Sequence, residues 1–392
     1  MSAAKKFTAT INMTRPHKTV AIVGAGIGGL TAALAFALNG ADVIVLEQAT
    51  EIKDVGAGIQ ITPNGARVLH ALGLSNECAE QGIAAKAVQP MDALTGCPIT
   101  YFDLSQQSPK YRFFHRSALQ LILVQAAVAA GVSLRLGQRV LSVSADGTVE
   151  TAGGLVRADI VVGADGINSV TRGMFNQPRA EFTGQVAWRD VIPVSDVYDQ
   201  ALIWMAPRRH VVTYPLKGGV LNIVAVQERT DWAQEGWNHG DSPQNLQAAF
   251  SDCAPNLRAI LAQSEAPSLW GLFRHPVSTV WSDGRVVLLG DAAHPTLPFL
   301  AQGANLAIED AYVLARCCAE QISIQNAFKL YQQLRYDRVV RAIESANANA
   351  KKYHLSGITR SSAFAGLKIL GMVAPDAFIN RYSWLYDHDV TG

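Results

Sequence analysis

The stretch TVAIVGAGIGGLTAALAFALNGADVIVLEQ, residues 19 to 48, decides the fold of this chain. Its first residues are β-branched and apolar and predict a strand, after which a cluster of glycines leads into a helix rich in Ala and Leu. A turn at Asn39 and Gly40 returns the chain to a second apolar strand, which ends at Glu47. This order of strand, glycines, helix, strand and acid predicts a βαβ unit of a parallel sheet.

The glycines of this unit indicate a ligand. Gly24 permits a tight turn, Gly26 lets the backbone approach a pyrophosphate, and Gly29 lets the helix pack closely on the strand. The helix N-terminus offers N–H groups and a positive dipole end to phosphates, and Glu47 stands where a carboxylate accepts ribose hydroxyls. A glycine-rich turn in an unrelated βαβ unit is the alternative. The residues expected to contact an ADP-containing dinucleotide here are Gly24, Gly26, Gly28, Gly29, Glu47 and Gln48.

Two later segments also run from an apolar strand into an acid. DIVVGADGINSVTR, residues 159 to 172, contains Asp165, and RVVLLGDAAHP, residues 285 to 295, contains Asp291. Acids at the C-terminal ends of parallel strands lie at the ligand edge of an open sheet, although an Asp there can also cap a helix. A second GxGxxG motif and a redox CxxC pair are both absent from the sequence, which argues against a disulfide-reductase-like flavoprotein.

Composition narrows the class of protein. The chain has 392 residues, of which 49% are hydrophobic and 17% charged, and its net charge of +1 gives no bulk attraction to nucleic acid or an anionic membrane. Five scattered cysteines lack metal-ligand spacing and fit a reducing compartment. Residues 1–18 lack the apolar region of a signal peptide, and no apolar run reaches the roughly 18 residues of a spanning helix. We expect a disordered tail at 1–18, a cytoplasmic protein and no metal site.

The three motifs in this order resemble those of the single-component FAD-dependent aromatic hydroxylases, the class A flavin monooxygenases. The resemblance covers nearly the whole chain after residue 18. Five further segments are similar to the branch that holds salicylate hydroxylase, 3-hydroxybenzoate 6-hydroxylase and 6-hydroxynicotinate 3-monooxygenase. They are VGAGIQITPNGARVLHALGL (55–74), HRSAL (115–119), AWRDVIP (187–193), RHVVTYPLKGG (209–219) and YSWLYDHD (382–389).

The resemblance implies an α/β fold: a Rossmann-like, GR2-type FAD-binding domain with an inserted antiparallel-sheet substrate domain and C-terminal helices. Alternating apolar residues between 181 and 272 are typical of half-buried antiparallel strands and agree with the insertion. The C-terminal helices are expected to pack on the FAD domain and are a candidate surface for a homodimer. The expected division is 19–75, 101–180 and 273–345 for the FAD domain, 76–100 and 181–272 for the substrate domain, and 346–392 for the C-terminal helices.

The resemblance also implies the reaction. The chain is expected to be an NAD(P)H-dependent flavoprotein monooxygenase with one non-covalent FAD and transient NADH or NADPH. It would hydroxylate a small phenolic or hydroxy-heteroaromatic carboxylate with O2 through a flavin C4a-hydroperoxide, since the cofactor carries the redox chemistry. The alternatives are a halogenase-like or epoxidising flavoenzyme and a non-catalytic flavin-binding protein. The segment at Trp188 lacks the second Trp of the halogenase motif Trp-x-Trp-x-Ile-Pro.

Family members hold FAD through residues beyond the first motif. By resemblance, Asp291 reaches the ribityl and pyrophosphate, Arg116 meets the phosphates, and Asp165 lies near the pyrophosphate. The N–H groups of a helix that opens at Gly303 would face the pyrimidine edge of the flavin and stabilise negative charge there. Gln60 occupies a position where one relative has a histidine, and Gln cannot act as a base. The further FAD contacts expected are Gly58, Ile59, Gln60, Arg116, Val140, Asp165, Asp291, Gly303, Ala304 and Asn305.

The substrate side is predicted to centre on His210 and Tyr214. They are four residues apart, so on a strand both point to the same face, and the matching residues of relatives line the substrate site. An imidazole with a pKa near neutrality can accept the proton of a phenol, although a lone strand histidine is often structural. Pro298, Phe299 and Leu300 are expected to border the pocket and keep it dry. Four cationic residues could each attract the carboxylate of a substrate, and the sequence singles out none of them. They are Arg189, Arg208, Arg209 and Lys217.

Overall fold

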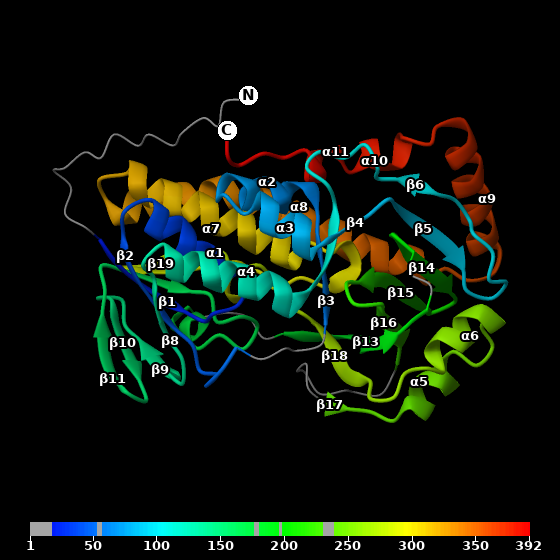
Figure 1. The fold of residues 1–392 in the computed structure, drawn as a ribbon, viewed down its shortest axis with the longest axis horizontal. Coiled ribbons are helices and arrows are strands. Elements are labelled where there is room, and N and C mark those ends of the chain that lie inside the picture. The colour runs from blue at the N-terminus through cyan, green and yellow to red at the C-terminus, as the bar shows by residue number, and fades with distance from the viewer. Residues whose placement is uncertain (1–17, 53–56, 176–179, 196–197, 230–238) are drawn as a thin grey trace.

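The structure is a computed structural model that describes residues 18–52, 57–175, 180–195, 198–229 and 239–392. The tail expected at 1–18 therefore lies outside the described residues, apart from Lys18. One sheet has six strands. Figure 1 shows this sheet with its helices beside a second, larger sheet. The long helix α8 (Ile324–Tyr353) extends over both.

The stretch at 19–48 forms the predicted βαβ unit. It consists of β1 (Thr19–Val23), α1 (Ile27–Leu38) and β2 (Asp42–Leu46), and β1 pairs in parallel with β2 and β12 (Ile160–Gly163). Every residue of β1 except Thr19 is buried, as is typical of parallel strands. The full strand order is β19 (Ser282–Asp283), β20 (Val286–Leu288), β12, β1, β2 and β8 (Ser133–Arg135), with β19 antiparallel to β20.

Helices pack around this sheet in a chain of contacts. α1 lies against α4 (Arg116–Ala129) and α7 (Gly303–Glu320), and α7 packs in turn on α2 (Pro63–Ala71) and α8. The short helix α3 (Ser75–Gln81) packs on α4. This packing fixes the start of α7 above the ends of β1, β12 and β20.

The inserted sheet has eight strands and is antiparallel except where β14 meets β5. One of its faces buries apolar residues against α5 (Pro243–Ala249) and α6 (Pro255–Leu261). The other face looks toward the six-stranded sheet. The strand order is β17 (His239–Gly240), β18 (Ser268–Arg274), β13 (Glu181–Pro193), β16 (Val220–Glu228), β15 (Arg209–Leu216), β14 (Gln200–Ala206), β5 (Ala87–Asp92) and β6 (Phe102–Asp103).

Two small antiparallel sheets complete the fold. One has the order β11 (Gly154–Arg157), β10 (Thr148–Thr151) and β9 (Val140–Val143), and the other has β3 (Gly58–Ile61), β7 (Arg112–His115) and β4 (Ile83–Ala84). Three short 3₁₀ segments are η1 (Thr171–Met174), η2 (Gly290–Ala292) and η3 (Pro298–Leu300). The architecture matches the predicted α/β class with an inserted sheet and C-terminal helices.

The elements shift some expected boundaries. β6 lies in a range expected for the FAD domain but joins the eight-stranded sheet, and β4 pairs instead with β7. α8 runs unbroken through the boundary expected at 345. The helices α9 (Gly357–Val373), α10 (Ala377–Arg381) and α11 (Ser383–Tyr386) follow it. Phe364 of α9 packs with Ile99 and Met205 of the substrate side, whereas α11 joins the main core.

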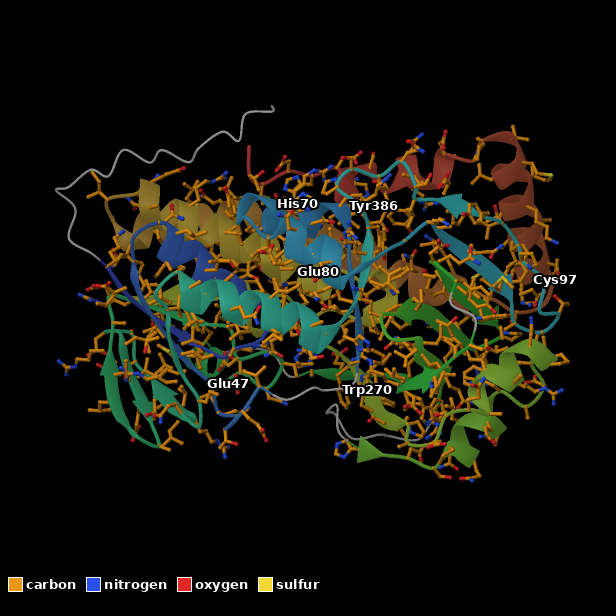
Figure 2. All side chains as sticks on the ribbon, in the orientation of Figure 1. Glu47, His70, Glu80, Cys97, Trp270 and Tyr386 are labelled. Carbon is orange, nitrogen blue, oxygen red and sulfur yellow. The ribbon has the colours of Figure 1, made fainter. Side chains whose placement is uncertain are left out.

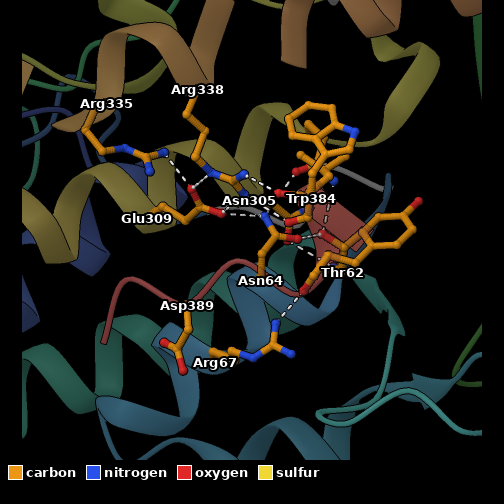
Figure 3. A network of polar contacts seen from close by, with 12 residues as sticks. Thr62, Asn64, Arg67, Asn305, Glu309, Arg335, Arg338, Trp384 and Asp389 are labelled. Atoms are coloured by element: carbon orange, nitrogen blue, oxygen red, sulfur yellow. Dashed lines mark hydrogen bonds and ion pairs between the residues drawn. The ribbon is translucent and has the colours of Figure 1, made fainter. Parts of the chain in front are cut away.

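A buried polar network holds α7 in place (Figure 3). Glu309 of α7 accepts hydrogen bonds from Asn64 of α2 at 2.6 Å and from Arg338 of α8 at 2.7 Å, and it pairs with Arg335 at 2.6 Å. Burial would raise the pKa of Glu309, but the two arginines outweigh it and hold the pKa below its ordinary value. Breaking one member of such a network typically costs about 3–5 kcal/mol. The network fixes the helix whose N-terminus faces the candidate site.

Candidate functional site

A cavity lies between the ligand edge of the six-stranded sheet and the inner face of the eight-stranded sheet. Segments far apart in the sequence line it: the glycine turn before α1, β3, the start of α4, the loop after β12, three strands of the large sheet, and the loop that leads into α7. The lining residues used below are Gly26, Gly28, Gly58, Ile59, Gln60, Arg116, Arg189, His210, Val212, Tyr214, Val224, Val226, Asp291, Pro298, Gly303 and Ala304.

The glycine turn has the geometry that its sequence predicts. Gly24 has a positive φ of +99°, and a β-carbon on it would stand 2.7 Å from the carbonyl oxygen of Ala164. A β-carbon on Gly29 would overlap the carbonyl oxygen of Gly24, so both positions require glycine. At Gly26 a β-carbon would meet nothing within 4 Å. That residue borders the cavity, and its missing side chain leaves room for a ligand against the backbone.

The acid of the fingerprint supports the same turn. Glu47 accepts hydrogen bonds from the N–H groups of Ala25 at 2.7 Å and Ala49 at 2.8 Å. Neither Glu47 nor the exposed Gln48 lines the cavity, and neither does the buried Val140 of β9. Figure 2 labels Glu47 to the left of Trp270, which belongs to β18. The roles of these three residues toward a cofactor stay predictions.

The two later acids are placed differently. Asp291, in η2, lines the cavity, and its burial raises its pKa while His294 and Arg116 pull the pKa down. Asp165 accepts hydrogen bonds from Ser169 at 2.5 Å and from the N–H of Thr171 at 3.0 Å. Its carboxylate thus caps η1, and its neighbours rather than Asp165 itself line the cavity. A contact of Asp165 with a cofactor stays a prediction.

The start of α7 opens onto the cavity. Gly303 and Ala304 are among the lining residues, and no side chain caps this N-terminus. Asn305 does not line the cavity, because its buried side chain bonds the N–H of Thr62 at 3.0 Å and the carbonyl of Gln60 at 3.0 Å. Asn305 therefore joins α7 to the end of β3. The open N-terminus supplies N–H donors and a positive dipole end to a ligand in the cavity.

The opposite wall is the inner face of the eight-stranded sheet. His210, Val212 and Tyr214 alternate along β15 and all line the cavity, as their spacing predicts. Across β16, Val226 pairs with His210 and Val224 with Val212, and both valines also line the cavity. A polar residue thus stands at each end of an apolar strip.

The two polar side chains differ in protonation. His210 is 2% exposed, and burial, with His354 adding to it, lowers its pKa well below 6.5 rather than leaving it near neutrality as expected. Its Nδ1 lies 2.8 Å from Nε2 of His354. Burial raises the pKa of Tyr214 to about 12, against the opposing effects of Arg189 and a hydrogen bond with Gln60. At neutral pH, His210 is therefore a neutral base and Tyr214 a protonated donor.

Of the four candidate cations, one reaches the cavity. Arg189 of β13 lines it and lies 5.5 Å from the ring centroid of Trp270. Arg208 pairs with Glu228 near the surface, Arg209 pairs with Asp252, and Lys217 donates to the carbonyl of Glu80. The two-residue period of a strand is the sequence signal that could have selected Arg189. Ala187, two residues before it, packs with Val224 and Val226, so both positions face the cavity side of the sheet.

The loop before α7 forms part of the cavity wall. Pro298 lines the cavity, whereas Phe299 and Leu300 do not. Phe299 is buried behind His210, with ring centroids 5.5 Å apart, and Leu300 packs against the main core. Phe299 and Leu300 therefore do not border the cavity directly, contrary to the expectation from the sequence. Sequence reasoning missed His354, Glu228 and Asn222, whose positions depend on contacts over long sequence distances.

The cavity as a whole fits an FAD. The open space at Gly26 suits a pyrophosphate, Arg116 supplies a cation, and the N-terminus of α7 presents N–H donors to the cavity. Within the described residues no group of His, Cys, Asp and Glu is arranged to hold a metal ion. The described helices also include none that is long and apolar enough to cross a membrane.

Comparison with known proteins agrees with this geometry. A family model described as "FAD binding domain" matches residues 17–346. The chain is 35% identical over 353 residues to 3-amino-4-hydroxybenzoate 2-monooxygenase from Streptomyces cremeus, covering 86% of this chain and 88% of that protein. It is 33% identical over 396 residues to 3-hydroxybenzoate 6-hydroxylase from Polaromonas naphthalenivorans, covering 95% and 96%.

The fold has a close counterpart among solved structures. The structure of Klebsiella pneumoniae HpxO complexed with FAD and uric acid matches with a TM-score of 0.80 at 25% identity, and covers 92% of this chain and 95% of that one. The family match spans most of the chain, and the two relatives are similar over nearly their whole length. The chain therefore belongs to the FAD binding domain family, among its FAD-dependent aromatic hydroxylases.

Proposed function

We propose that this protein uses FAD, NAD(P)H and O2 to hydroxylate a small phenolic or hydroxy-heteroaromatic carboxylate. One observation carries the proposal: one cavity is bordered on one side by the glycine turn before α1 and the start of α7, and on the other by His210, Tyr214 and Arg189. The two relatives named above act on hydroxylated benzoates, according to their names. A base, a hydroxyl donor and a cation on one wall are the groups that recognise such a molecule.

His210 serves as the proton acceptor. Its lowered pKa keeps the imidazole neutral at physiological pH, so it is ready to take a proton from a substrate hydroxyl. Removing that proton makes the aromatic ring a better nucleophile. Tyr214, four residues along β15, keeps its own proton and donates a hydrogen bond that orients the ring.

Arg189 is the counter-charge for a carboxylate. A guanidinium presents its donors in a plane that matches the two oxygens of a carboxylate. Burial lowers the pKa of Arg189, with Tyr214 acting in the opposite direction, so a bound carboxylate would offset the cost of burying the cation. The position of Arg189 on β13, two strands from His210, would hold the acid end of a substrate away from the reacting hydroxyl.

The apolar residues between these groups keep water out. The apolar strip on the sheet consists of Val212, Val224 and Val226. Leu297 and Pro298 line the cavity from the loop that faces this strip. When bound, FAD supplies the redox chemistry that activates O2 with electrons from NAD(P)H. The chain itself binds and orients the ring, moves the hydroxyl proton at His210, and excludes water.

A substrate panel tests the proposal. The FAD-loaded protein is incubated with 3-hydroxybenzoate, salicylate, 3-amino-4-hydroxybenzoate or 6-hydroxynicotinate, with NADH and NADPH in parallel. We expect at least one acid to stimulate NAD(P)H oxidation and to yield a product heavier by one oxygen atom in mass spectrometry. Hydrogen peroxide is measured as a control for unproductive oxidation.

Three results would contradict the proposal. If every acid stimulated NAD(P)H oxidation but yielded only hydrogen peroxide, the protein would not be a hydroxylase of these acids. Stable FAD binding with no substrate-stimulated oxidation at all would favour the non-catalytic flavin-binding protein. A chlorinated product that requires chloride would favour the halogenase-like alternative.

A further inference from the structure

A continuous line of hydrogen bonds leads from the cavity to the surface. His210 Nδ1 lies 2.8 Å from His354 Nε2, and His354 Nδ1 lies 2.8 Å from Glu228 Oε1. The second carboxylate oxygen of Glu228 lies 3.2 Å from Nε of Arg208. The line joins β15 and the end of β16 to the C-terminal end of α8, which is far from both strands in the sequence.

Exposure to water rises along this line. His210 is 2% exposed, His354 is 7% exposed, and the side chain of Glu228 is 33% exposed. The first member borders the cavity and the last reaches solvent. The three side chains thus connect a buried base to bulk water.

The line also fixes which nitrogen of each imidazole carries the proton. A carboxylate only accepts, so His354 Nδ1 carries a hydrogen and donates it to Glu228, while His354 Nε2 is an acceptor. His210 Nδ1 must then donate to His354 Nε2. His210 Nε2 is left as the nitrogen with a lone pair, which is the form that a base requires.

We propose that His354 and Glu228 form the path by which the substrate proton leaves His210. The proposal rests on the proposed hydroxylase function. The substrate O–H bond breaks as a proton binds His210 Nε2, the proton on His210 Nδ1 passes to His354 Nε2, and the proton on His354 Nδ1 passes to Glu228 and then to water. The reverse transfer restores the starting tautomers when the product regains its hydroxyl.

The charges around the pair explain why a path is needed. Burial lowers the pKa of His210 and of His354, the latter against the opposing effect of Glu228. An imidazolium that stayed on His210 would be a buried charge of high cost. The titratable or charged groups that face the pair are Tyr353 of α8, Glu228 of β16 and Arg208 of the β14–β15 turn.

The backbone holds the path in place. The N–H of Arg208 donates to the carbonyl of His354 at 3.2 Å, and the N–H of Glu228 donates to the carbonyl of Arg208 at 2.9 Å. Arg208 adopts a left-handed φ of 61°, a conformation that a non-glycine residue rarely takes. This turn sets Glu228 beside the end of α8.

The test is the variant Glu228→Gln, which keeps a hydrogen-bonding side chain of the same size but cannot carry the proton. His354→Asn is the second variant, and thermal unfolding of the FAD-loaded protein checks the fold of both. Asp199→Asn is the matched control, because Asp199 forms an exposed ion pair with Lys86 outside this line. Stopped-flow ultraviolet absorbance follows phenolate formation when 3-hydroxybenzoate binds to the oxidised holoenzyme, and hydroxylation is measured in parallel.

We expect Glu228→Gln to slow phenolate formation and hydroxylation about 10-fold in dilute buffer, less than the roughly 10²- to 10⁴-fold cost of removing a base itself. Added imidazole should restore both rates in the two variants, and Asp199→Asn should behave as wild type. Wild-type rates in Glu228→Gln, or slow rates that imidazole does not restore, would overturn the path. So would the absence of bound phenolate in a wild-type protein that hydroxylates. Failure of the wild-type protein to hydroxylate any acid would instead reject the proposed function.

Discussion

The ring of Tyr214 lies so close to Gly58 that a β-carbon on Gly58 would stand 2.7 Å from the ring. The N–H of Gly58 also donates to the side chain of Asn222 at 2.7 Å, and Asn222 pairs with Tyr214 across β15 and β16. Gly58 lines the cavity, and the space that its missing side chain leaves is taken by Tyr214 and Asn222, while its contact with the flavin stays a prediction. The contact fixes β3 against the sheet that carries His210.

The variant Gly58→Ala should therefore displace Tyr214. A shift of about 1 Å in a positioning residue can cost on the order of 10²-fold in rate, so kcat/KM for the best acid of the panel should fall by about 10-fold or more. Steady-state hydroxylation measures it. Gly366→Ala on α9 is the matched control, because a β-carbon there meets nothing within 4 Å. Wild-type kcat/KM in Gly58→Ala would show that the ring can move without consequence.

A β-carbon at Gly26, unlike one at Gly58, should leave the protein packing unchanged. Its φ of −71° suits any residue and a β-carbon would meet nothing within 4 Å, so Gly26→Ala should unfold at the wild-type temperature when FAD is absent. The same β-carbon borders the cavity, so FAD affinity should fall, and Gly26→Val should abolish binding of the single expected FAD. Flavin fluorescence titration of the apoprotein measures affinity.

Gly29→Ala provides the contrast, because its β-carbon would overlap the Gly24 carbonyl. That variant should lose thermal stability even without FAD. Full FAD affinity in Gly26→Ala would reject the placement of the pyrophosphate at this turn.

Phe299 supports His210 rather than bordering the cavity directly. The variant Phe299→Ser removes a buried ring that lies 5.5 Å from the imidazole, so it should lower the free energy of unfolding by about 3–5 kcal/mol. The fraction of NAD(P)H that yields hydrogen peroxide instead of product should rise as water reaches the site. Phe299→Leu keeps an apolar side chain and is the control. An unchanged peroxide fraction in Phe299→Ser would show that the loop does not shield the reaction.

The parts of this fold that sequence predicted are those with local signals. The βαβ unit follows from the order of glycines and apolar runs at 19–48, and the shared face of His210 and Tyr214 follows from the two-residue period of a strand. The hydrogen bond between His210 and His354 spans 144 positions and has no local pattern. It depends on where α8 ends over the sheet, which only the packing of the whole chain decides.

Arg189 should hold the substrate carboxylate. The variant Arg189→Met removes the charge but keeps an apolar stem, and KM for a hydroxybenzoate should rise about 10- to 100-fold, as expected for a lost hydrogen bond to a charged group of about 1.5–3 kcal/mol. An analogue without the carboxylate should show little change between wild type and variant. Arg209→Met is the matched control, because Arg209 pairs with Asp252 and does not line the cavity. A KM in Arg189→Met equal to that of the wild type would show that another residue holds the substrate carboxylate.

His210 makes the strongest prediction about pH. Its folded pKa lies well below 6.5, so the neutral base persists above 6.5 and is lost only as pH falls through the lowered value. The acid limb of hydroxylation should therefore lie below 6.5 instead of near neutrality. Stability follows the same sign: the unfolded chain takes up a proton near 6.5 that the folded chain resists, so His210 lowers the free energy of unfolding as pH falls below that point.

The variant His210→Ala should keep FAD and the fold, lose the acid limb, and hydroxylate about 10² to 10⁴ times more slowly. Tyr214→Phe should act more mildly, mainly on substrate affinity, because it removes one hydrogen bond and the tyrosine stays protonated with its pKa at about 12. Rate profiles from pH 4.5 to 9, about two units either side of neutrality, measure both effects. Near wild-type hydroxylation with the acid limb intact in His210→Ala would leave His210 a structural residue. The proton would then leave through water or Tyr214, while the FAD site would stand unchanged.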